Sequence, residues 1–248
     1  TEYAGTVDAR DFIHNESINA HMPARDVEHL LALYDGEIRW VDDHLAQVVA
    51  RLESSAQTDE TVLIITSDHG DEFFEHGGKG HGITLYREVM QVPLIISGAG
   101  VANDTVAAPV SLVDIAATIY DLAGVDPSAK PRSSRSLLRW RDLPAGEAVF
   151  AARCLSYSPS CRFLRHNDAG SLLLSLWPFE SRYFAATDRE QRFNLAAAPG
   201  PAVQDAFAEL VAGLNRQWQT HESLRRERQA TTAAMRERLR TLGYDRTD

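Results

Sequence analysis

Residues 61–70 read TVLIITSDHG, and this stretch decides the fold class. Its first six residues form a continuous β-branched and apolar run, which is typical of a strand buried on both faces, as in a parallel sheet covered by helices. A second run of the same kind covers residues 92–97, VPLIIS, and ends at Gly98-Ala-Gly100. The two runs therefore predict core strands of an α/β protein.

Helical patterns lie on either side of these strands. From about Ala24 to Leu52, apolar residues recur at steps of three and four, which predicts one long helix with a single apolar stripe. Residues 111–122 repeat the helical spacing and stop at Gly124. The order helix, strand, long loop, strand, helix predicts an α/β core. The stripe comprises Val27, Leu30, Leu31, Tyr34, Ile38, Val41, Leu45, Val48 and Leu52.

The pattern changes after Pro127, so we expect residues 1–126 to form the core and residues 127–248 a second, smaller unit. Residues 127–146 are rich in Ser, Arg and Pro and predict a connecting loop. A helical tail is expected from Pro201 to about Arg240. Four short strands separated by turns predict a small antiparallel sheet, at Ala148–Cys154, Cys161–Arg165, Ser171–Leu176 and Arg182–Ala186.

The bulk composition excludes several classes of protein. The chain has 248 residues, 44% of them hydrophobic, with a mean hydropathy of -0.27, which suits a globular protein with a large core. Its net charge of -10 disfavours nucleic-acid binding. No apolar run approaches the roughly 20 residues that span a bilayer. Cys154 and Cys161 either pair or stay free, so the compartment remains open.

One segment, residues 67–86, carries the groups capable of chemistry. It packs three histidines, four carboxylates, one lysine and five glycines into twenty residues directly after a predicted strand. Asp68 offers an oxygen ligand and His69 a nitrogen ligand to one metal ion. Lys79 and His81 alternate, so in extended backbone they would share one side of the chain. A cation beside an imidazole suits an oxyanion such as sulfate or phosphate.

Ordered motifs along the chain resemble the sulfatase family of the alkaline phosphatase superfamily. The resemblance extends to about Leu214, and it implies an alkaline-phosphatase-like core sheet flanked by helices, with a small antiparallel sheet and a terminal helix. Its motifs are LYDGEIRWVD at 33–42, TSDHG at 66–70, EHG at 75–77, GHG at 80–82, LY at 85–86, VPLII at 92–96, VDIAATI at 113–119 and FNLA at 193–196.

The resemblance also implies a divalent metal ion held by two pairs of ligands. The second pair maps onto Asp68 and His69, whereas the first pair, near the amino terminus of such enzymes, has no counterpart here. Calcium is the usual ion, and a histidine ligand also tolerates manganese or zinc. The basic residue that binds sulfate oxygens falls on His81, and Lys79 takes or shares that role.

The nucleophile of such enzymes, within a Cys/Ser-x-Pro-x-Arg segment, has no match in this chain. The chain has no initial methionine and no signal-like start. We therefore expect the carboxy-terminal part of a sulfuric ester hydrolase, which acts on a small anionic ester together with a missing amino-terminal half. Two alternatives stay open: a phosphate- or phosphonate-directed hydrolase or transferase of the same superfamily, and a non-catalytic sulfatase-like binding or scaffold domain. His76 either supports the site or lies on the surface.

Overall fold

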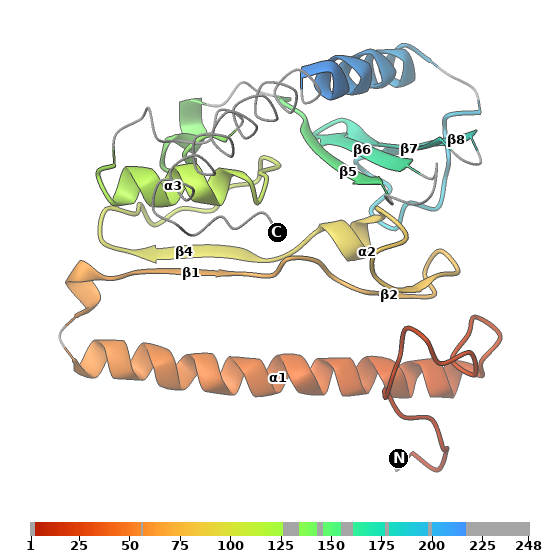
Figure 1. Ribbon diagram of the computed structural model, residues 1–248, viewed down its shortest axis with the longest axis horizontal. Coiled ribbons are helices and arrows are strands. Elements are labelled where there is room, and N and C mark those ends of the chain that lie inside the picture. The colour runs from red at the N-terminus through yellow and green to blue at the C-terminus, as the bar shows by residue number, and fades with distance from the viewer. Residues whose placement is uncertain are drawn as a thin grey trace, which may run out of the picture.

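The computed structural model describes residues 3–55, 57–125, 134–142, 146–154, 161–176, 179–197 and 200–216. Strands β1 (Val62–Thr66) and β4 (Leu94–Gly98) form the predicted central pair. Figure 1 shows helix α1 (Ala24–Ser54) running along one side of this pair and helix α3 (Asp114–Leu122) on the other. The predicted α/β order of helices and strands is therefore confirmed.

Strands β1 and β4 are antiparallel, so the parallel pairing expected from their apolar runs is wrong for this pair. Thr66 lies opposite Leu94, and Val62 lies opposite Gly98. The chain therefore leaves β1 and enters β4 at the same end of the strand pair, as antiparallel neighbours do. Within the described residues this sheet has two strands, which explains why β1 is only partly buried instead of enclosed on both faces.

Helix α1 matches the predicted helix closely, but much of its apolar stripe is uncovered. Leu30 is buried near the start of the helix. Farther along, Ile38 is 54% exposed, and Val41 and Val48 are also exposed. Since amphipathic helices gain most of their stability from packing an apolar face, this stripe is a surface suited to contact with further protein.

The second unit is a four-stranded antiparallel sheet covered by a helix at residues 201–216. Its own core is a cluster of Leu172, Tyr183, Val203, Ala206 and Leu210. The observed strands confirm the four predicted ones: β5 (Val149–Cys154), β6 (Cys161–Asn167), β7 (Gly170–Leu176) and β8 (Phe179–Ala185), in that order across the sheet.

Some expectations for the second unit fall outside the described residues. These are the boundary at 126/127, the turn at 177–178 and the helical tail beyond residue 216. The expected connecting loop contains a short 3₁₀ helix, η3 (Leu137–Asp142). Cys161 is disulfide-bonded and lies opposite Cys154 in the strand register. No helix in the described ranges has both the length and the apolarity needed to cross a bilayer.

Candidate active site

The candidate site lies on the connection between β1 and β4, residues 67–93. Three short elements occur in it: β2 (Glu72–Phe73), β3 (Lys79–Gly80) and helix α2 (Arg87–Met90). Strands β2 and β3 pair with each other and form a small hairpin within the connection. Because both ends of the connection are fixed by the β1–β4 pair, its side chains are held at one edge of the core.

Gly70 fixes the course of the chain directly after the metal-binding pair predicted from sequence. Its amide donates to the carbonyl of Val89 at 2.8 Å. A Cβ atom at this position would lie 2.1 Å from the carbonyl oxygen of Glu88. Only glycine allows this approach, so the backbone after His69 is pressed against α2.

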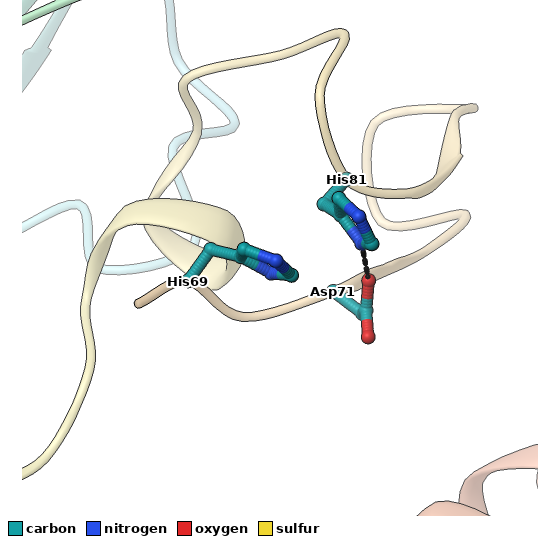
Figure 2. Close-up of side chains that lie close together, drawn as sticks. All are labelled: His69, Asp71 and His81. Carbon is teal, nitrogen blue, oxygen red and sulfur yellow. Dashed lines mark hydrogen bonds and ion pairs between the residues drawn. The ribbon is translucent and has the colours of Figure 1, made fainter. Parts of the chain in front are cut away.

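His69, Asp71 and His81 gather on one side of the connection (Figure 2). One ligand atom from each lies within 4.8 Å of the other two. His81 Nδ1 is 2.8 Å from the Asp71 carboxylate. The rings of His69 and His81 stack with their centroids 3.8 Å apart. The structure therefore brings together two residues predicted from sequence, His69 and His81, and adds Asp71.

Asp68 lies beside this group, and its side chain is 87% exposed. Its Oδ2 atom is 3.6 Å from His69 Nε2. Hydrogen bonding from its own backbone amide and the attraction of His69 lower the pKa of the Asp68 carboxyl. An exposed carboxylate that ionises readily beside an imidazole can serve as a metal ligand.

Lys79 contacts a different part of the chain. Its ammonium group donates to the carbonyls of Asn15 at 2.6 Å and Ile18 at 2.8 Å, and so holds the N-terminal segment against β3. Gly80, between Lys79 and His81, has a φ of +67°. The backbone is therefore not extended here, and the alternation that would place both side chains on one side does not apply.

A second and more buried group of possible ligands lies on the same connection. Glu72 is 1% exposed, and its carboxylate accepts hydrogen bonds from the amides of His76 and Gly78 and from the hydroxyl of Thr84. His76 Nδ1 is 2.7 Å from the Glu88 carboxylate. Together with Glu88 these residues offer another three possible ligand atoms. Because the oxygens of Glu72 already accept three bonds, we interpret this group as the framework of the loop.

The segment that follows β8 contacts this framework directly, and β8 contacts it through Tyr86. His76 Nε2 is 3.2 Å from the carbonyl oxygen of Gln191, and the side-chain oxygen of Gln191 accepts from the amide of Arg87 at 2.8 Å. Arg182 on β8 donates to the hydroxyl of Tyr86, whose ring stacks on His76. Burial raises the pKa of Tyr86. His76 therefore supports the site loop instead of lying on the surface.

The sequence patterns did not single out Asp71, Glu72, Glu88 or Gln191. One signal pointed to Asp71: it lies two residues after His69, so in extended backbone both would face one side. Glu72 directly follows Asp71, so in extended backbone the two side chains face opposite sides, which fits one half-buried and one fully buried carboxylate. Gln191 is more than 100 residues away from its partner Arg87, so local patterns could not reveal it.

The amino-acid sequence of this chain is similar to a known family model and to known proteins. A family model described as "Sulfatase" matches residues 2–125. Arylsulfatase K of Danio rerio is 35% identical over 124 residues, which cover 50% of this chain and 23% of that protein. The choline-sulfatase of Rhizobium meliloti (strain 1021) is 28% identical over 107 residues, covering 43% of this chain and 21% of that protein. The chain thus aligns with less than a quarter of the length of either relative.

Solved structures show the same fold over most of the chain. A structure of a 2-O GAG sulfatase superposes with a TM-score of 0.68 at 23% identity, covering 83% of this chain and 46% of that one. A phosphonate monoester hydrolase from Silicibacter pomeroyi superposes with a TM-score of 0.63 at 24% identity, covering 81% of this chain and 42% of that one. The chain therefore matches a little under half of the length of each of these two structures.

Proposed function

Because this chain belongs to the sulfatase family, we propose that it forms the carboxy-terminal part of a metal-dependent sulfuric ester hydrolase. One observation carries the proposal: Asp68 and His69 lie one residue beyond the end of β1, and His81 stacks on the ring of His69. The substrate in this proposal is a small anionic ester, with a sulfate ester as the first candidate. Arylsulfatase K and choline-sulfatase among the relatives support that choice.

Asp68 and His69 would hold a divalent metal ion. Their chemistry fits such an ion, since an ionised carboxylate oxygen and an imidazole nitrogen lie 3.6 Å apart and both side chains are accessible. A bound metal would act as a Lewis acid on the ester and orient the nucleophile. Calcium is the first candidate from the family, and the imidazole of His69 equally suits manganese or zinc.

His81 would bind the sulfate oxygens and stabilise charge that develops on the transferring group. Lys79 is the second candidate for this role, because the sequence does not decide between Lys79 and His81. The hydrogen bonds of the Lys79 ammonium to Asn15 and Ile18 favour His81, because two of its three donors are already used. The nucleophile would come from outside residues 1–248.

The nucleophile and the first pair of metal ligands would come from an amino-terminal half of the same protein. The solved neighbours extend over about twice the part that this chain matches. The exposed stripe of α1 and the two-stranded β1–β4 sheet are surfaces that such a half would cover. We also propose the division of the chain into 1–126 and 127–248, which the separate core of the second unit supports.

The test uses the native polypeptide that contains residues 1–248, assayed with an aryl sulfate. The Asp68→Ala and His69→Ala variants should lose more activity than the roughly 10- to 100-fold that outer partners of metal ligands cost. Asp205→Ala and His21→Ala, which change exposed residues elsewhere, are the matched controls and should keep activity. Peptide mapping upstream of Thr1 should find a Cys/Ser-x-Pro-x-Arg segment with the mass shift of formylglycine.

A second candidate is a phosphonate- or phosphate-directed hydrolase. A relative named as a multifunctional protein of the alkaline phosphatase superfamily, PehA of Trinickia caryophylli, keeps this candidate open, with 36% identity over 90 residues that cover 36% of this chain and 17% of that protein. Assays with matched aryl sulfate and aryl phosphonate esters separate the two functions. A native polypeptide that hydrolyses neither ester, with metal present, would leave the non-catalytic scaffold as the remaining function.

A further inference from the structure

We propose that Asp71 is the residue that positions His81 for binding the substrate anion. The proposal rests on the proposed function and deepens it, because it explains how one histidine on a glycine-rich loop keeps a defined orientation. The Asp71 carboxylate lies 2.8 Å from His81 Nδ1 (Figure 2), so it occupies one ring nitrogen and leaves Nε2 for an oxygen of the substrate.

Asp71 lies on backbone that is fixed on both sides. Before it, Gly70 is bonded to Val89 and pressed against the carbonyl of Glu88. After it, the side chain of Glu72 is buried and accepts three hydrogen bonds from the loop. A carboxylate held between two such anchors offers a fixed acceptor, and it is only 25% exposed.

His81, in contrast, lies between two glycines with positive φ angles, Gly80 at +67° and Gly82 at +81°. Glycine permits many backbone conformations, so the local chain does little to orient the ring. Two contacts do so instead: the hydrogen bond to Asp71 and the stacking against His69. Removing the Asp71 carboxylate leaves only the stacking against His69, which holds the ring less firmly.

The orientation matters because the two nitrogens of a histidine are not equivalent. Because the Asp71 carboxylate lies at Nδ1, Nε2 is the ring nitrogen left to contact an anion. Asp71 also places a negative charge next to the ring, on the side opposite to the anion. Preorganised donors of this kind stabilise a transition state without any reorganisation when the reaction occurs.

The same three residues also suit another role, in which Asp71 ligates the metal ion with His69 and His81. The hydrogen bond between Asp71 and His81 favours positioning, since a ring nitrogen that donates its hydrogen to a carboxylate has no lone pair left for a metal ion. The two roles differ in one measurable quantity. A positioning residue changes catalysis and leaves metal affinity unchanged, whereas a ligand changes both.

The experiment compares Asp71→Ala and Asp71→Asn with wild type and with the Asp205→Ala control, in the native polypeptide. The kcat for an aryl sulfate should fall roughly 10- to 100-fold in the alanine variant. The asparagine variant should recover part of this loss, because its side-chain oxygen still accepts from Nδ1. The dissociation constant for Mn²⁺, from calorimetry, should stay within about twofold of wild type while the melting temperature is unchanged.

Two results would overturn the proposal: full activity in Asp71→Ala, or a loss of Mn²⁺ affinity parallel to the loss of kcat. A ring-nitrogen NMR spectrum of His81 tests the positioning without any turnover, since loss of the Asp71 contact should shift the Nδ1 resonance. If the wild-type protein hydrolyses no sulfate ester, the proposed function fails by itself. An unchanged His81 spectrum in Asp71→Ala would then still overturn the role of Asp71.

Discussion

Replacing Glu72 with alanine should destabilise the loop that carries the candidate site. The carboxylate is 1% exposed and accepts from the amides of His76 at 3.1 Å and Gly78 at 2.7 Å, and from the hydroxyl of Thr84 at 3.0 Å. The hydroxyl can rotate to another partner, but the two amides are left without an acceptor. At about 1.5–3 kcal/mol for each hydrogen bond to a charged group, the cost is roughly 3–6 kcal/mol.

Glutamine at the same position should cost far less. Its side-chain oxygen can keep both amide bonds, and the hydroxyl of Thr84 can accept from the new amide group instead of donating. The expected loss is about 1–2 kcal/mol, since only the charge is removed. Glu190→Ala is the matched control, because that glutamate is exposed and forms a surface ion pair worth at most about 1 kcal/mol.

Urea unfolding measures the free energies, and hydrogen exchange locates the effect. The amides of His76 and Gly78 should lose protection in the alanine variant and keep most of it in the glutamine variant. A loss below about 1 kcal/mol for alanine would refute the reasoning. Equal losses for alanine and glutamine would refute it as well, because the cost would then follow the charge and not the hydrogen bonds.

Three further changes test other parts of the fold by thermal unfolding. Gly70→Ala should destabilise strongly, because the new methyl group meets a carbonyl of α2 at 2.1 Å, whereas Gly36→Ala in open space on α1 should stabilise by about 1 kcal/mol; the reverse order would contradict the packing. Leu210→Ala should cost about 2–5 kcal/mol and the exposed Val211→Ala less than about 0.5 kcal/mol; equal costs would deny the second core. Burial is the main cause that lowers the pKa of His166 below 6.5, and the charge of the neighbouring Arg165 lowers it further. The stability that the neutral ring contributes is therefore fully present above pH 6.5 and is lost as the pH falls through the lowered pKa. His166→Gln should therefore lose less stability than wild type between about pH 7.5 and about pH 5, and equal losses would contradict this.

The helices and strands were predictable because each has a local cause. Apolar spacing located α1, and β-branched runs located β1 and β4 to within two residues. The direction in which the strands pair was not predictable from the same signal. A connection of residues 67–93 is long enough for a parallel crossover, and it contains a short helix, α2. Only the structure shows that this connection returns to the end of the strand pair from which it started.

The sequence predicts which residue types form the candidate site, but it does not predict which partners their side chains contact. Asp68, His69 and His81 belong to motifs of the family, and the types themselves indicate metal and anion chemistry. The partners of Lys79 and His81 depend on the bend at Gly80, whose φ of +67° removes the extended alternation. Asp71 is one of 35 acidic residues in the chain, so its type alone carries no signal.

The segment that follows the small sheet helps to hold the candidate site, although it carries none of the residues predicted for chemistry. The carbonyl of Gln191 lies 3.2 Å from His76 Nε2, and the other nitrogen of the same ring meets Glu88. The backbone amide of His76 in turn donates a hydrogen bond to the carboxylate of Glu72, the residue next to Asp71. Each link in this series is a hydrogen bond between groups that are at least partly buried, where a lost partner costs more than it does at the surface. If Asp71 orients His81 from fixed backbone, as we propose, these hydrogen bonds connect the segment after β8 to the candidate site through the loop.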